Sequence, residues 1–198
     1  MEPWLIHPDL TEERLVDVAR LIAKGRNDAL DRYEPEIGDN GWTLGTRAFQ
    51  FGRHQILVGA ESGEYPWLQI VDGSLRLIFQ IGEVPVRFYK GIADEPTDRT
   101  LRQSFPELRQ LSFIFPHDAD ASDFLFRFAV ETGLDGEITS IKFVALREEE
   151  PVHVWDVPLA HSVTTLYPLG STSAGGVELP PPHVGLPEDE AAEDSKAG

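Results

Sequence analysis

Residues 67–90, WLQIVDGSLRLIFQIGEVPVRFYK, constrain the fold of this chain more than any other stretch. Asp72-Gly73 and Gly82-Glu83 are two-residue turn sequences between apolar runs, as found in β-hairpins of type I′ and type II′. In both turn types glycine supplies the positive φ that most residues avoid. The stretch therefore predicts three antiparallel strands joined by two tight turns.

The register that these turns impose sorts the side chains of the meander onto two faces, because alternate residues of a strand point to opposite sides. It places Ile70 opposite Leu75 and Phe79 opposite Val86. One face is apolar throughout and forms the predicted core: Leu68, Ile70, Leu75, Leu77, Phe79, Ile81, Val84, Val86 and Phe88.

The second face of the meander mixes cationic and aromatic side chains. Arginines beside tryptophan and tyrosine can hold an anion or stack on a planar group. Together with two arginines from the next helical stretch, they form the predicted ligand- or partner-binding set: Trp67, Gln69, Arg76, Arg87, Tyr89, Arg99 and Arg102. The competing interpretation is structural, with Trp67 and Ile78 under a helix and the arginines extending to the rim.

Two amphipathic helices are predicted ahead of the meander. The first begins at an Asp9 cap, with Glu12 three residues later, and its apolar stripe extends to about Tyr33. Arg26 falls inside that stripe, which predicts either a side chain that reaches solvent or an ion pair. The second helix begins at an Asp39 or Asn40 cap.

Large residues and glycines each recur every seven residues in the second helix. The large residues are Trp42, Phe49 and Ile56, and the glycines are Gly45, Gly52 and Gly59. A glycine inside a helix costs about 1 kcal/mol relative to alanine, so their regular placement predicts close backbone contact along one face. A strand over residues 48–58 is the alternative for this segment.

The rest of the chain predicts a short helix from Thr97 or Asp98 and strands over residues 111–115, 124–131, 138–146 and 152–157. About seven strands after two helices, mostly with short connections, predict the α+β class. The expected architecture is two N-terminal helices on a mainly antiparallel sheet, built from meanders 67–90 and 111–157. It forms one domain, 1–168, and residues 169–198 are expected to be a disordered acidic tail rich in Pro, Gly and Ser.

The chain has 34 acidic and 17 basic residues, a formal net charge of −17 at pH 7, and no cysteine. Such a charge repels phosphates, so we expect no direct nucleic-acid binding and no anionic membrane partner. Without cysteine, disulfides and thiolate chemistry are excluded. There is no signal-peptide pattern and no apolar run of about 20 residues, so we expect a cytoplasmic, bacterial protein.

Motifs for catalysis are missing: the sequence contains no HExxH, Walker A, GxGxxG or GxSxG pattern. A carboxylate–lysine nuclease pattern fails around Lys142, because residue 140 is serine. The acidic run at residues 118–123 lacks the central glycine and closing glutamate of a calcium loop. No catalytic residue, metal ligand or cofactor is therefore predicted.

These observations favour a non-enzymatic accessory protein that regulates or neutralises a protein partner by direct contact. The first alternative is a small-ligand or anion-binding domain, or an enzyme, that uses the arginine and aromatic face of residues 67–90. The second is an acidic mimic of nucleic acid. The sequence leaves the oligomeric state open.

Overall fold

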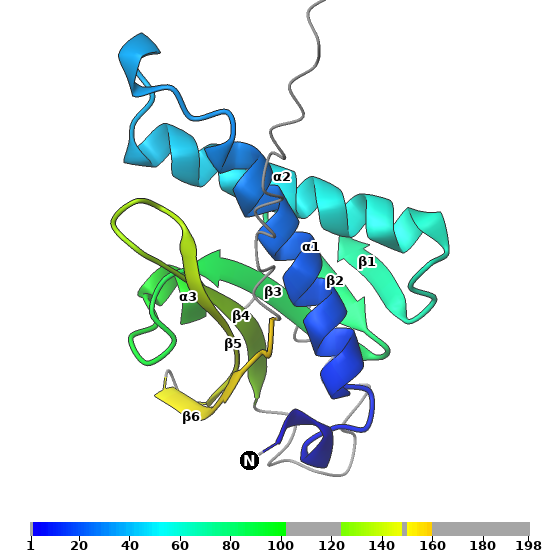
Figure 1. Cartoon of the computed structure of the whole chain (residues 1–198). Helices are drawn as coiled ribbons and strands as arrows, with labels where there is room; N and C mark the ends of the chain where they lie inside the picture. Colours follow the sequence, from blue (N-terminus) through cyan, green and yellow to red (C-terminus); the bar gives the residue numbers. More distant parts are fainter. Residues whose placement is uncertain (1, 102–123, 148–149, 160–198) are drawn as a thin grey trace, which may run out of the picture. The chain divides into compact units, whose positions relative to one another are not determined.

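The computed structural model describes residues 2–101, 124–147 and 150–159. After a 3-10 turn, η1 (Pro3–Leu5), the chain forms two long helices, α1 (Glu12–Leu30) and α2 (Gly41–Ser62). They make a helical hairpin whose connection contains a second 3-10 turn, η2 (Pro35–Ile37) (Figure 1). The predicted helix over residues 42–58 is confirmed, and the strand alternative for this segment is wrong.

The remaining described elements form one six-stranded sheet in the order of the sequence. Its strands are β1 (Leu68–Asp72), β2 (Ile78–Ile81), β3 (Val84–Lys90), β4 (Leu125–Thr132), β5 (Ile138–Arg147) and β6 (Glu150–Asp156), and α3 (Asp98–Leu101) follows β3. Neighbouring strands are antiparallel, except that β3 and β4 are parallel. The predicted α+β class is confirmed. The strand predicted over 111–115, the domain limit at 168 and the tail over 169–198 lie outside the described residues.

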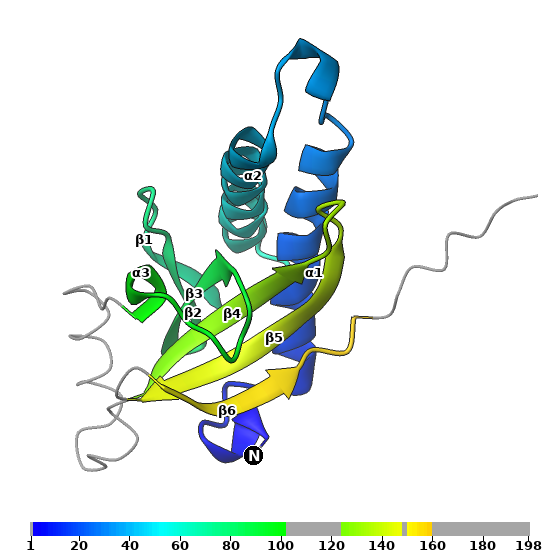
Figure 2. The same cartoon turned by 90° about the vertical axis from the view of Figure 1, so that its left-hand side faces the viewer.

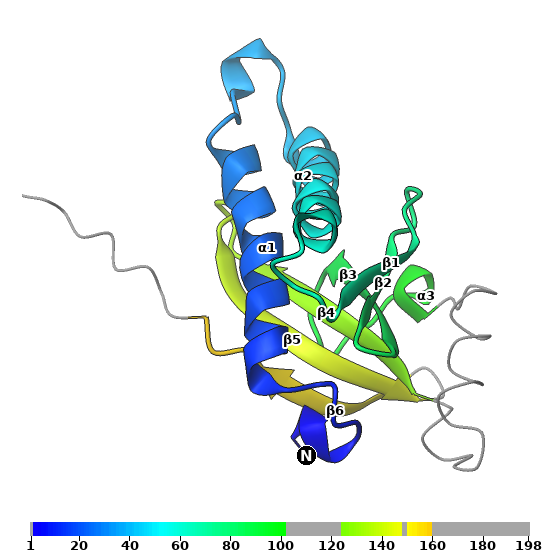
Figure 3. The same cartoon turned by 90° about the vertical axis from the view of Figure 1, so that its right-hand side faces the viewer.

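Both long helices pack on the same face of the sheet, as Figures 2 and 3 show from opposite sides. The ring of Phe49 on α2 lies 5.2 Å from that of Phe88 on β3. Beneath the helices, Phe128 on β4 contacts Phe143 on β5 edge-on at 5.0 Å. This aromatic and aliphatic layer is the core, and it matches the apolar face predicted for the meander except at Leu75, which is exposed.

The helices cross where two glycines bring their backbones into contact. A Cβ atom added to Gly25 of α1 would lie 2.2 Å from the backbone nitrogen of Gly52 of α2. Gly59 lies against side chains instead: a Cβ atom added there would lie 3.1 Å from Cδ1 of Leu21 and 3.4 Å from Cδ2 of Tyr65. The predicted close backbone contact is thus confirmed at Gly52. It is wrong at Gly59, where the nearest atoms belong to side chains, and at Gly45, which has nothing within 4 Å.

The start of α1 differs from the prediction because Asp9 has another role. Thr11 is the N-cap, and its side chain accepts a hydrogen bond from the backbone N–H of Arg14. The Asp9 carboxylate instead accepts from the backbone N–H of Glu83, in the β2–β3 turn, and from the Arg14 guanidinium. A long-range partner therefore replaces the local capping box.

Arg26 is neither at the surface nor in an ion pair with a described residue. It is 4% exposed, and its Nε donates a 2.8 Å hydrogen bond to the backbone carbonyl of Gly136 in the β4–β5 turn. Both predicted alternatives for this residue are wrong. The guanidinium instead ties the β4–β5 turn to α1.

The first hairpin of the meander has a longer loop than predicted, whereas the second is confirmed. Ile70 pairs with Phe79, four residues beyond the predicted partner, and residues 73–77 form the loop. The Asp72 side chain accepts from the Ser74 N–H, and Arg53 of α2 donates to the carbonyls of Gly73 and Ser74. These hydrogen bonds stabilise the longer loop in place of the predicted two-residue turn. Because the shift is an even number of residues, the side chains keep their predicted faces.

Candidate functional site

The predicted binding residues do not form one cluster. Arg87 and Tyr89 lie on β3 and share a face, whereas Gln69 is exposed on the edge strand β1. Trp67 precedes β1 and contacts α1, with the Arg14 guanidinium 5.7 Å from its ring centroid. The Arg99 side chain and all of Arg102 lie outside the described part of the chain.

The charges of Arg76 and Arg87 both act on one acidic residue, Asp72. The pKa of Asp72 is lowered chiefly by its hydrogen bonds with Ser74, and the charges of Arg76 and Arg87 lower it further. Arg76 itself lies in the 73–77 loop rather than in a strand. This pair of arginines therefore has a nearby carboxylate as a counter-charge, which weakens its attraction for an external anion.

Sequence reasoning missed a polar cluster on the sheet face opposite the long helices. Glu131 of β4 accepts from the Ser140 hydroxyl at 2.7 Å and lies 3.2 Å from Nζ of Lys142, both on β5. Its second oxygen accepts from the backbone N–H of Ala93, in the loop after β3. The sequence signal that could have revealed this cluster is the alternation of side chains along β4 and β5. Because the two strands are joined by a short turn, residues 131, 140 and 142 fall on one face of the hairpin.

The electrostatics of this cluster oppose a catalytic role. Burial alone would raise the pKa of Glu131, but hydrogen bonds from Ala93, Ser140 and Lys142 outweigh it and lower the pKa. The hydrogen bond to Glu131 raises the pKa of Lys142, so the lysine stays protonated. Burial, reinforced by the charge of Glu131, raises the pKa of Tyr89 to about 12. None of these groups is poised as a base or nucleophile near neutral pH.

The Glu131 cluster should instead make stability depend on pH. Since the folded-state pKa of Glu131 is depressed, its stabilisation is present above the unfolded-state pKa and disappears as the pH falls through the folded-state value. We expect Glu131→Gln to lower the free energy of unfolding by about 1–3 kcal/mol at pH 7 and by much less in acid. Urea unfolding of both proteins across the acidic range measures this difference.

Glu137→Gln is the matched control for that experiment, because Glu137 is an exposed acid in the adjoining β4–β5 turn. It should change the free energy of unfolding by less than about 0.5 kcal/mol at any pH. A Glu131→Gln difference that does not shrink on acidification would contradict the stabilisation expected from the ionised Glu131 carboxylate.

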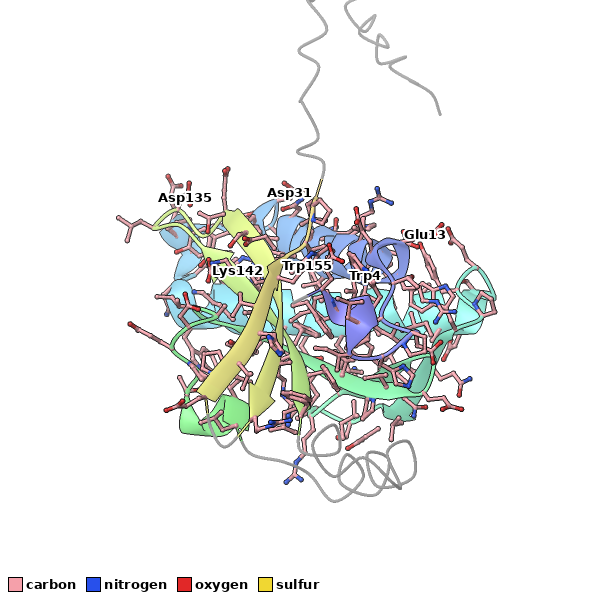
Figure 4. All side chains as sticks on the ribbon, turned by 90° about the horizontal axis from the view of Figure 1, so that it is seen from below. Trp4, Glu13, Asp31, Asp135, Lys142 and Trp155 are labelled. Atoms are coloured by element: carbon pink, nitrogen blue, oxygen red, sulfur yellow. The ribbon has the colours of Figure 1, made fainter. Side chains whose placement is uncertain are left out.

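A second cation on this sheet face, Arg127, also forms internal hydrogen bonds. It is 2% exposed, and its guanidinium donates to the carbonyls of Thr100 and Phe126. Glu131, through Ala93, and Arg127, through Thr100, thus hold the segment after β3 against the sheet. Figure 4 shows Lys142 beside β6, and Trp155 of that strand contacts Trp4 of η1 edge-on at 5.8 Å.

The most exposed tryptophan in the described part of the chain is Trp42, where the connection between α1 and α2 meets α2. We call residues 31–42 the α1–α2 tip. Trp42 is 76% exposed and Ile37 is 78% exposed. The predicted stripe of Trp42, Phe49 and Ile56 is therefore wrong at Trp42, because only Phe49 and Ile56 face the core.

The α1–α2 tip is firmly built although its apolar side chains are exposed. Asn40 and Thr43 form a reciprocal capping box that starts α2, as predicted for Asn40. Arg47 holds both carboxylate oxygens of Asp39 at 3.0 Å and also donates to the Arg32 carbonyl. A small core behind the tip consists of Ala29, Leu44 and Ala48, covered by Leu30, Tyr33 and Phe51. Trp42 lies about 200° around the helix from Leu44, so packing of Leu44 turns the indole outward.

The tip is also acidic. Residues 31–42 contain four carboxylates and one arginine, and Asp31, Glu34 and Glu36 are all exposed. In the described residues no three histidine, aspartate or glutamate side chains gather closely enough to hold a metal ion. The tip therefore exposes an indole and an isoleucine side chain on a surface that also carries exposed carboxylates.

Comparison with known proteins adds no relative. No protein-family model, curated protein or solved structure matches this chain. None of the described helices combines the length and the apolar character that crossing a membrane requires.

Proposed function

We propose that this chain is a non-enzymatic accessory protein that acts by binding a protein partner through the α1–α2 tip. The observation that carries the proposal is the exposure of Trp42 and Ile37, five residues apart, on a connection held by its own hydrogen bonds and small core. Tryptophan is among the residues most enriched at the centres of protein interfaces, where burial of its large ring supplies much of the binding free energy.

The construction of the tip supports binding rather than loose packing. Contacts of the Asn40 cap, the Asp39–Arg47 pair and Leu44 order the backbone on both sides of Ile37 and Trp42. A surface that is ordered before binding loses less conformational entropy when a partner covers it. The polar clusters on the sheet face, by contrast, are occupied by internal contacts.

Replacing Trp42 with alanine should weaken partner binding by about 30-fold or more, the effect of losing an interface hot spot of about 2 kcal/mol. The fold should be unaffected, with a change in unfolding free energy within about 0.5 kcal/mol, because the indole is exposed. The measurement is chemical cross-linking and co-purification of the full chain from its native cells, followed by affinity measurement with the recovered partner.

Leu75→Ala is the matched control, since Leu75 is 69% exposed in the β1–β2 loop, away from the tip. It should leave partner recovery and affinity unchanged. Recovery of the same partner at the same affinity by the Trp42→Ala protein would refute the proposal, as would a wild-type chain that recovers no partner.

A further inference from the structure

We propose that the partner of the α1–α2 tip presents an apolar pocket flanked by lysine and arginine side chains. The inference rests on the proposed function, and it adds the chemistry of the partner. Trp42 and Ile37 would enter the pocket, and the carboxylates around them would pair with the basic rim.

Three of the tip carboxylates are available for such pairing. Asp31, Glu34 and Glu36 are exposed and form no ion pair with any residue that the structure describes. Asp39 differs, because Arg47 already holds both of its oxygens. The tip thus contains three carboxylates that can pair with a partner and one, Asp39, that is already paired within the chain.

The position of Asp31 disfavours the helix that carries it. Asp31 is the C-cap of α1, whose last turn contains no basic residue, although Arg32, just beyond the helix, donates to the Asp28 carbonyl and offsets part of the cost. A negative charge at the negative end of the helix dipole costs stability, typically about 0.3–1 kcal/mol, where a cation would contribute it. A charge that opposes local stability is expected where it serves binding.

The charge also argues against a second copy of this chain as the partner. The tip would meet another surface of a protein whose formal net charge is −17, and like charges placed opposite each other are repelled. A basic partner is attracted by the same field, which accelerates association at low ionic strength. The charge complement of the tip is therefore a cationic protein surface.

The probes for a test are two synthetic two-helix peptides with the same leucine-lined groove between their helices, one with arginines and the other with glutamates along the rim of the groove. Binding to the full-length chain is followed by NMR through the indole N–H signal of Trp42, assigned with Trp42→Phe. We expect the arginine peptide to shift this signal and the amide signals of residues 31–42, and the glutamate peptide to shift neither. Affinity for the arginine peptide should fall several-fold between about 50 and about 300 mM salt.

Two triple variants distinguish the effect of the tip charges from the effect of the net charge of the protein. Each of them removes three negative charges. The tip variant is Asp31→Asn, Glu34→Gln, Glu36→Gln, and the control is Glu13→Gln, Glu61→Gln, Glu64→Gln at the opposite end of the helical hairpin, where all three acids are exposed. The tip variant should lose about tenfold in affinity for the arginine peptide and the control less than about twofold.

Equal loss in both triple variants, or equal binding of both peptides, or binding of neither, would overturn the inference. The proposed function fails separately, through undiminished partner binding by Trp42→Ala. If Trp42→Ala loses its partner while the two triple variants behave alike, the tip is a docking surface and only the basic rim is wrong.

Discussion

Replacing Gly25 with alanine should destabilise the protein by about 3 kcal/mol or more, a large fraction of the about 5–15 kcal/mol by which folded domains are stable. The added Cβ would lie 2.2 Å from the nitrogen and 2.5 Å from the Cα of Gly52, and 2.6 Å from the carbonyl carbon of Phe51. These are backbone atoms, so no side-chain rotation can relieve the overlap. The helices must separate, and separation withdraws α2 from Phe88 and the sheet.

Gly45→Ala is the matched control for Gly25→Ala. Gly45 is also a helical glycine, but nothing lies within 4 Å of an added Cβ. Alanine there should raise the free energy of unfolding by about 0.5–1 kcal/mol, the ordinary helix preference over glycine. Urea unfolding of both variants gives opposite signs if the close crossing is correct. A Gly25→Ala protein as stable as the wild type would disprove the crossing.

Gly82→Ala should cost about 2–4 kcal/mol by breaking the link between the N-terminal arm and the β2–β3 turn. Gly82 has a φ of +60°, and an added Cβ would lie 2.1 Å from Cγ of Asp9. The Asp9 carboxylate would have to leave its hydrogen bonds with the Glu83 N–H and with Arg14. Burial raises the pKa of Asp9, but those two hydrogen bonds outweigh it and hold the pKa low.

Two comparisons separate the strain at Gly82 from the loss of the Asp9 contacts. Gly63→Ala meets no atom within 4 Å at a φ of +77°, so it should cost only the backbone penalty of about 1 kcal/mol. In an Asp9→Ala background, the cost of Gly82→Ala should fall to about that same value. Equal costs of Gly82→Ala in both backgrounds would show that Asp9 is not the cause.

Much of the fold followed from local chemistry. The Asn40 cap of α2 and the Gly82-Glu83 turn were predicted because their partners lie within a few residues. The alternating apolar residues of the meander and of β4 identified the buried face, and the even register shift between β1 and β2 left that face unchanged. Class and layer order depend mainly on such patterns.

The candidate site was much less predictable. Trp42 fitted an apolar stripe of the right period, and only the packing of Leu44 against the small core shows that the indole is turned outward. The sequence pattern does not single out Glu131, because its partners Ser140 and Lys142 become its neighbours only when β4 and β5 pair. The periodicity of apolar residues indicates which side chains share a face, but not which face another element of the fold buries.

By itself the sequence of residues 67–90 determined a meander with one apolar face and a tight Gly82-Glu83 turn, because both properties depend on neighbours along the chain. The tertiary structure decided the length of the first loop, through the contacts of Arg53 with Gly73 and Ser74. It also decided that Asp9 binds a distant turn instead of capping α1. Hydrogen bonds and burial between distant segments outweigh local preferences of about 1 kcal/mol, and such partners are set only when the chain is folded.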